Sequence, residues 1–144
     1  MKEVFIVSGA PGSGKTTYVK KHKKPQDIVI DIDYICAALQ LEKNVHANHD
    51  SVWRMAVCMR DSLYPIIANR FGDWNDCWII TAEAKRDKVK ELAKMVKATD
   101  TIEINTPITE NLKRIERDKS RALKADDFKE MAKRWHSKHK RPPY

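Results

Sequence analysis

Long apolar runs are absent from this sequence, and cysteine and glycine are scarce. No run approaches the roughly 20 apolar residues of a membrane span, so we expect no membrane-spanning segment. A charged residue and a predicted strand follow Met1 at once, and we therefore expect no signal peptide. The cysteines are odd in number and far apart. This excludes the spacing of a zinc site and predicts reduced thiols, without a disulfide, in a cytoplasmic protein: Cys36, Cys58 and Cys77.

The chain has the size of one globular domain, and its charge is uneven. It has 144 residues, of which 42% are hydrophobic. Its net charge is +8, and residues 112–144 carry +7 of this with 12 basic and 5 acidic side chains. We expect a single domain over residues 1–144 that ends in a basic helix and tail at about 126–144. Such a segment fits either a polynucleotide ligand or a solvated helix face.

Three of the four glycines lie in one loop between a predicted strand and a predicted helix. The strand, Val4 to Val7, is apolar and mostly β-branched. The loop has the pattern G-x-x-x-x-G-K-[ST]. In loops of this pattern the backbone N–H groups and the start of the helix bind phosphates. The lysine reaches the β- and γ-phosphates, and the hydroxyl, here that of Thr16, ligates Mg²⁺. We therefore predict a site for a nucleoside triphosphate, ATP or GTP, with Mg²⁺. The predicted binding residues are Gly9, Ala10, Pro11, Gly12, Ser13, Gly14, Lys15, Thr16 and Thr17.

Short apolar strands alternate with helices along the chain. We predict strands at residues 4–7, 28–30, 77–81 and 101–105, and helices at 17–21, 34–41, 50–70, 85–97, 109–120 and 126–136. Asp50 and Ser51 are expected to cap the helix at 50–70, whose inward stripe should include Met55, Met59 and Ile66. The alternation predicts an α/β fold, a P-loop NTPase with three α/β/α layers and a largely parallel sheet. In such a sheet the carboxyl ends of the strands gather beside the glycine loop.

Acidic residues follow the second and third predicted strands. Asp33 should face the terminal phosphate, where a carboxylate can accept the proton of an attacking hydroxyl or hold Mg²⁺-bound water. Capping of the next helix is the alternative, and for Asp31 it is the favoured interpretation. Many proteins with this loop end the third strand in an aspartate. Here Thr81 and Glu83 stand near that place, and we expect Glu83 to be a surface or capping residue.

Arginines cluster in the predicted helix at 109–120 and just after it. Arg117 and Arg121 are four residues apart, which places them on one helical face, and Arg114 can share part of it. Two guanidinium groups on one face can neutralise the charge of a transferring phosphoryl group, as in a helical lid. Ion pairs with the acidic residues of the same helix are the alternative.

These residues together resemble a small P-loop kinase. More narrowly, the chain resembles the kinase domain of phage polynucleotide 5′-kinases and the related zeta-toxin-type kinases. The resemblance covers about residues 1–125 and rests on the glycine loop, on Asp33 before a helix, and on residues 116–121, which resemble the arginine-bearing lid of that group. It implies transfer of the γ-phosphate of ATP to a hydroxyl, above all the 5′-hydroxyl of DNA or RNA. It also implies Asp33 as general base, Thr16 as Mg²⁺ ligand, and Lys15, Arg117 and Arg121 as further catalytic residues.

Two departures from that group concern the substrate. Cys36 stands where those kinases usually carry an arginine, and Thr81 to Ala84 differ from their pattern after the third strand. A small nucleoside or nucleotide acceptor is therefore an alternative, and so is a P-loop ATPase or nucleic-acid-binding module without kinase activity. For such a module, Trp135 among cations could stack on bases; with Phe128 and Met131 it would instead form the buried face of the last helix.

Overall fold

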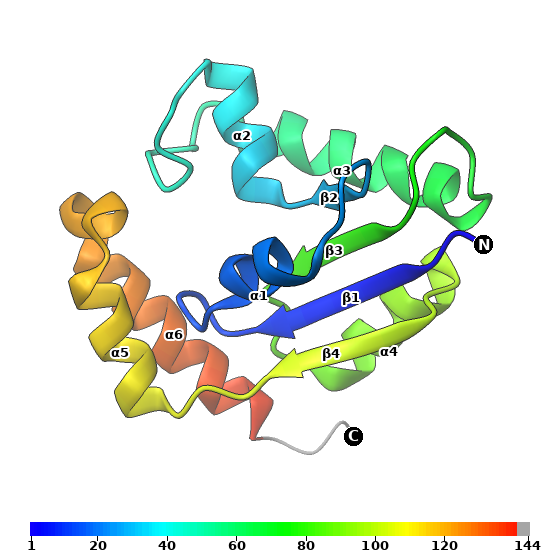
Figure 1. Ribbon diagram of the computed structural model, residues 1–144. Helices are drawn as coiled ribbons and strands as arrows, with labels where there is room; N and C mark the ends of the chain where they lie inside the picture. The colour runs from blue at the N-terminus through cyan, green and yellow to red at the C-terminus, as the bar shows by residue number, and fades with distance from the viewer. Residues whose placement is uncertain (141–144) are drawn as a thin grey trace.

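The computed structural model describes residues 1–140, with the backbone alone at 122–124, and its centre is a four-stranded sheet (Figure 1). The strands are β1 (Val4–Gly9), β2 (Ile28–Ile30), β3 (Cys77–Thr81) and β4 (Asp100–Ile104). Their order is β2-β3-β1-β4, and all three pairs are parallel. The predicted parallel sheet is thus confirmed.

Helices fill the connections between the strands. They are α1 (Lys15–His22), α2 (Ile32–Gln40), α3 (Trp53–Ala68), α4 (Arg86–Val96), α5 (Ile108–Arg117) and α6 (Ala125–His139), with a 3₁₀ helix, η1 (Lys119–Lys124), before α6. α1 covers one face of the sheet, and α3 and α4 cover the other. This is the expected three-layer α/β/α fold of a P-loop NTPase. α5, η1 and α6 stand beside the carboxyl ends of β1 and β4 (Figure 1).

Two apolar clusters lie on opposite faces of the sheet because side chains alternate between the faces of a strand. Val4 and Ile6 of β1 are fully buried against the layer of α3 and α4. Val7, on the opposite face, packs with Val19 of α1 and Trp78 of β3. The sheet is therefore held on both faces, and the loop between β1 and α1 leaves a fixed strand and enters a fixed helix.

The start and the outer face of α3 differ from the prediction. The helix begins at Trp53 with Val52 as its N-cap, so Asp50 and Ser51 do not cap it. The side chain of Asn48 accepts a hydrogen bond from the Asp50 N–H (2.8 Å), which keeps this segment in a turn. The predicted apolar stripe is also only partly inward, because three of its members are exposed: Met55, Met59 and Ile66.

The predicted helix at 109–120 ends early. α5 stops at Arg117, and Asp118 takes an extended backbone conformation. The Asp118 side chain then accepts a hydrogen bond from the Ser120 N–H (2.9 Å) and caps η1. This local bond competes with continuation of the helix. The expectation that Arg117 and Arg121 share one helical face is therefore wrong.

Two expectations drawn from composition can be compared with the structure. Within residues 1–140, no helix is both long and apolar enough to cross a membrane. All three cysteines carry free thiols, as expected; Cys36 and Cys77 are buried and Cys58 is exposed.

Candidate nucleotide and phosphoryl-transfer site

In the first half of the glycine loop, two backbone carbonyls accept hydrogen bonds from the lysine of the same loop. The Nζ atom of Lys15 donates to the carbonyl oxygens of Gly9 (2.8 Å) and Ala10 (2.7 Å). The Ser13 N–H also donates to the Ala10 oxygen (3.1 Å). The Ser13 hydroxyl is buried and has no hydrogen-bond partner within the described part of the chain. The loop thus holds a cation and a free hydroxyl at one place, as a phosphate site requires.

Two side chains from outside the loop bind its remaining carbonyls. Nδ2 of Asn111, on α5, donates to the Pro11 oxygen (2.7 Å), and Oγ1 of Thr106 donates to the Ser13 oxygen (2.8 Å). In a trans peptide the C=O and the next N–H point in opposite directions. The N–H of Gly12 therefore points away from Asn111. With its carbonyls engaged, the loop has N–H groups left for an anion.

Two loop glycines have a left-handed backbone on which any other residue would be strained. Gly12 has φ +74°, and a Cβ there would lie 2.6 Å from Cγ1 of Ile115. Gly14 has φ +103°, and a Cβ there would lie 3.0 Å from a guanidinium nitrogen of Arg114. Left-handed backbone and close approach of α5 both demand glycine. The loop is therefore packed directly on α5, and together with the start of α1 it fits the phosphates of a nucleotide.

Lys15 and Asp31 are buried close together behind the loop. Burial lowers the pKa of Lys15 to about 8, against the opposing effect of the Asp31 charge. Burial likewise raises the pKa of Asp31. Oδ1 of Asp31 accepts a hydrogen bond from the Asp33 N–H (2.8 Å), and Asp31 is the N-cap of α2. The capping interpretation of Asp31 is thus confirmed.

Asp33 lies in the first turn of α2, two residues beyond that cap. Its side chain is 37% exposed. Partial burial, and then the neighbouring charge of Asp31, raise the pKa of its carboxyl to about 6, while His49, and then the positive charges of Arg121 and Lys15, oppose this. Asp33 therefore shares its surroundings with the loop lysine and with an arginine of η1. Asp33, which follows β2, thus lies near the glycine loop, as the sequence predicted.

Two histidines that the sequence analysis did not single out lie beside Asp33. Nδ1 of His46 and Nε2 of His49 are each 3.9 Å from an Asp33 carboxylate oxygen. Nε2 of His49 contacts the Val45 oxygen (2.7 Å) and its Nδ1 contacts the Gln40 amide (3.0 Å). Nδ1 of His46 is buried and has no hydrogen-bond partner within the described part of the chain. Burial lowers the pKa of this ring to about 4. The available signal was two histidines in the short loop after the Asp33 helix.

The loop that carries His46 also contacts the segment that carries Arg121. Nδ2 of Asn44 donates to the Ser120 oxygen of η1 (2.9 Å). His46 meets Phe128 of α6 edge-on, with 5.7 Å between ring centroids. The Arg121 guanidinium lies 5.0 Å from the centroid of the same Phe128 ring. The Asp33 side and the arginine side of the site are thus joined by direct contacts.

The three arginines occupy different positions. Arg121 is mostly buried and forms an ion pair with Asp118. Arg117 is exposed at the last turn of α5. Arg114 reaches the glycine loop at Gly14 and pairs with Glu110 (3.6 Å between Nε and Oε1). The structure therefore brings Arg121 and Arg114 to the site from separate elements, and it leaves Arg117 at the surface.

The third strand leads into a loop with its own capping contacts. Oε1 of Glu83 accepts a hydrogen bond from the Lys85 N–H (3.0 Å) just before α4, and the Glu83 N–H donates to Oγ1 of Thr81 (3.1 Å). Glu83 is exposed. The expectation of a surface or capping glutamate is confirmed.

The last helix is packed against the site. Trp135 is 6% exposed and lies with Ala10 of the loop and Ala84 after β3. It is therefore core, as the alternative interpretation held, and it does not offer a ring for base stacking. Met131, expected on the same buried face, is exposed. The end of the expected basic tail, residues 141–144, lies outside the described residues.

The oxygen atoms around the loop suit Mg²⁺. Between residues 1 and 140 there is no group of three or more His, Cys, Asp or Glu side chains that could hold a metal ion. Mg²⁺ commonly takes only one or two protein ligands and completes its shell with water and substrate phosphates. The Thr16 hydroxyl, half-buried in the first turn of α1, fits that role.

Comparison with known proteins agrees with this geometry. A search of curated proteins gives no match. A chain in a solved structure of the Pnkp1/Rnl/Hen1 RNA repair complex is similar, with 15% sequence identity and a TM-score of 0.58. The match covers 95% of this chain but only 46% of that chain. The expected resemblance to P-loop kinases of the polynucleotide type is confirmed as a resemblance of fold. A family model described as AAA domain matches residues 4–141, and the chain therefore belongs to that family of P-loop proteins.

Proposed function

We propose that this chain is a kinase that transfers the γ-phosphate of ATP to an acceptor hydroxyl. The observation that carries the proposal is the position of Asp33 in the first turn of α2, which follows β2 directly, two residues beyond the cap Asp31. The positive charges of Arg121 and Lys15 also act on the pKa of its carboxyl. A carboxylate beside the loop lysine and an arginine suits a proton acceptor next to a phosphoryl group. A protein that only binds nucleotide has no need of a base there.

Each residue then has a definite task. The loop N–H groups and Lys15 hold the triphosphate, for which Lys15 exchanges the Gly9 and Ala10 carbonyls for phosphate oxygens. Thr16 would hold Mg²⁺, which when bound neutralises charge on the phosphates. Asp33 takes the proton of the acceptor hydroxyl. At the same time the hydroxyl oxygen bonds to the γ-phosphorus, and the bond between the γ-phosphorus and the bridging oxygen of the β-phosphate breaks. Arg121 stabilises the charge on the transferred group.

For the acceptor we propose the 5′-hydroxyl of a DNA or RNA end. The similarity of fold to a chain in an RNA repair complex supports this choice. So does a set of exposed cations on α5 and at the start of η1, which could contact a phosphate backbone: Lys113, Arg117 and Lys119.

A small hydroxyl compound, such as a nucleoside or nucleotide, is the second candidate. Two observations favour it. Cys36, at the place where a substrate-binding arginine was expected, is fully buried and offers no cation to a substrate phosphate. Trp135 is buried and cannot stack on a base.

The test is a transfer assay with γ-labelled ATP and Mg²⁺. The acceptors are 5′-hydroxyl DNA, the same DNA with a 5′-phosphate as matched control, 5′-hydroxyl RNA, nucleosides and nucleoside monophosphates. We expect label on the 5′-hydroxyl strands alone. Label only on small acceptors would establish the second candidate. ATP binding without transfer to any acceptor would contradict the kinase proposal and leave an ATPase or a nucleic-acid-binding module.

A further inference from the structure

We propose that Asn111 and His136 form a bridge that holds the glycine loop in its nucleotide-binding shape, which makes the last helix a working part of the nucleotide site. The inference rests on the proposed function only as far as nucleotide binding. It does not depend on the acceptor or on phosphoryl transfer.

The bridge runs from the loop through α5 to α6. Asn111 is fully buried, and its Nδ2 donates to the Pro11 oxygen at 2.7 Å. Its Oδ1 lies 3.0 Å from Nε2 of His136, which donates to it. Both ends of the amide are therefore satisfied, as a buried side-chain amide requires. The bridge links two residues 25 positions apart in the chain and ends on the loop itself.

The Pro11 oxygen and His136 together hold the Asn111 amide in one orientation. An asparagine amide can turn over and exchange its donor and acceptor ends. In the turned orientation Oδ1 would face the Pro11 oxygen, which can only accept, and two acceptors would meet in a buried place. With Nδ2 on Pro11, Oδ1 faces His136, whose Nε2–H donates to it and anchors the far end of the amide. His136 thus acts on the loop through Asn111 and is a positioning residue.

The orientation of Asn111 in turn sets a peptide plane of the loop. While the Pro11 C=O is bound by Asn111, the Gly12 N–H must point the opposite way. Gly12 is also in the left-handed region, with φ +74°, and packs on Ile115 of α5. Donors that are already oriented cost little to reorganise when an anion binds. Without the bridge, the Pro11–Gly12 peptide plane could rotate, and the Gly12 N–H would no longer have a fixed direction.

α6 has further anchors besides His136. Trp135 packs on Ala10 and Ala84. His139 contacts the Ala84 oxygen through Nδ1 (2.9 Å) and Glu103 of β4 through Nε2 (2.6 Å). Because these contacts hold the helix, a change at His136 alone removes the bridge without releasing α6.

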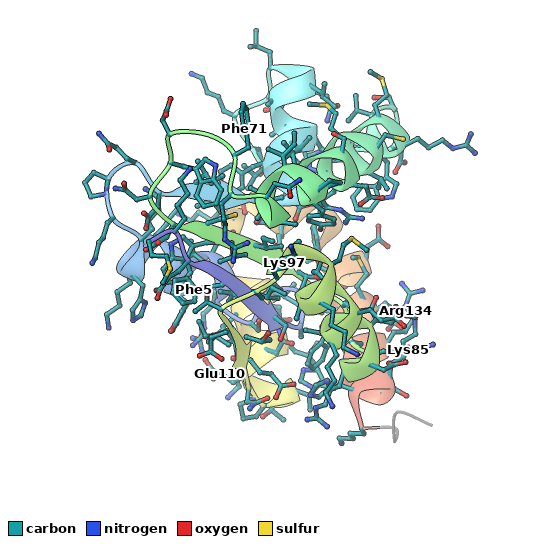
Figure 2. All side chains as sticks on the ribbon, turned by 90° about the vertical axis from the view of Figure 1, so that its right-hand side faces the viewer. Phe5, Phe71, Lys85, Lys97, Glu110 and Arg134 are labelled. Carbon is teal, nitrogen blue, oxygen red and sulfur yellow. The ribbon has the colours of Figure 1, made fainter. Side chains whose placement is uncertain are left out.

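The experiment compares His136→Asn with His136→Gln. The amide nitrogen of glutamine reaches about as far as Nε2 of histidine and can donate to Asn111, whereas asparagine is one methylene too short. The control is Arg134→Gln on the same helix; Arg134 is exposed and lies at the edge of the molecule in Figure 2. Affinity for ATP is measured by titration with Mg²⁺, and thermal unfolding is recorded for every variant.

We expect His136→Asn to weaken ATP binding roughly tenfold, since one buried hydrogen bond and the orientation it imposes are lost. His136→Gln should stay within about twofold of the unchanged protein, as should Arg134→Gln. Equal affinity in His136→Asn and the unchanged protein would overturn the bridge. The bridge would also be overturned if the asparagine and glutamine variants lost the same ATP affinity and this loss matched a drop in their unfolding temperatures, because that pattern indicates packing alone. No ATP binding by the unchanged protein would overturn both proposals, whereas binding without phosphoryl transfer would overturn only the kinase.

Discussion

At the residue scale, two aspartates of one segment have separate tasks because a helix begins between them. Asp31 is the N-cap of α2, buried, with its carboxylate bound to the Asp33 N–H. Asp33 is in the first turn, half-exposed, and has a raised carboxyl pKa of about 6. A cap needs an acceptor, which an asparagine also supplies, whereas a general base needs a carboxylate.

Asp33→Asn should abolish transfer and spare ATP binding. Because the proton acceptor is lost while size is kept, the transfer rate at saturating ATP should fall roughly 10²–10⁴-fold. Asp31→Asn is the matched control and should keep most activity, since asparagine caps helices about as well as aspartate. Both variants are measured for ATP affinity and for single-turnover transfer. If Asp31→Asn were inactive and Asp33→Asn normal, the assignment of the base would be wrong.

At the scale of elements, the segment from Asp118 to Phe128 contacts the loop of His46. Its backbone leaves the helix at Asp118 and continues as η1. Asn44 binds the Ser120 oxygen, and Arg121 and His46 both contact Phe128. The break after α5 is what turns Arg121 toward the buried charges of the site, while Arg117 stays exposed.

Arg121→Ala should therefore lower kcat more than Arg117→Ala. For an arginine that stabilises the transferred group we expect a loss of roughly 10²-fold in kcat with a smaller change in KM for ATP. Arg117→Ala tests whether the second lid arginine reaches the substrate when it is bound, and from its exposed position we expect a smaller loss. Steady-state kinetics and thermal unfolding are recorded together. Full kcat with a lowered unfolding temperature for Arg121→Ala would show that the residue only pairs with Asp118.

At the scale of the whole molecule, the packed site gives two groups pKa values close to neutral pH. Asp33 must be ionised to accept a proton, and burial together with Asp31 raises its pKa to about 6. Lys15 must be charged to bind phosphates, and burial lowers its pKa to about 8. Under the proposed mechanism we therefore expect the free protein to be active between these two values.

The plot of kcat/KM against pH should be bell-shaped, with an acidic limb near pH 6 and a basic limb near pH 8. Activity falls below the first because Asp33 is protonated and above the second because Lys15 is neutral. In Asp33→Asn the residual rate should lose the acidic limb and keep the basic one. An unchanged acidic limb in that variant would contradict the assignment.

Stability should follow the same two groups with signs that can be worked out. The folded pKa of Lys15 lies below its ordinary value of 10.5, so this group adds stability above pH 10.5 that is lost as pH falls through about 8. The folded pKa of Asp33 lies above its ordinary value of 3.8, so its contribution is present below pH 3.8 and lost as pH rises through about 6. Protonation of Asp33 thus favours stability and opposes activity, whereas protonation of Lys15 favours activity and opposes stability.

The sequence by itself determined the parts of this protein that depend on short stretches of chain. A strand, a glycine loop and a helix start that follow one another predicted the phosphate site, and alternating strands and helices predicted the parallel sheet. The position of Asp33 just after β2, at the edge of the sheet where the glycine loop lies, could be predicted because parallel strands end at one edge. In each case the deciding interactions are local backbone geometry or a simple rule of sheet topology.

Tertiary structure alone decided the rest. The spacing of Arg117 and Arg121 assumed a continuous helix, but the bond from Asp118 to Ser120 ends it. His46 reaches Asp33, Trp135 reaches Ala10, and His136 acts on the loop through Asn111, all from distant parts of the chain. Which polar side chain meets which buried partner depends on how helices pack against strand ends, and helix spacing in the sequence carries no record of that packing.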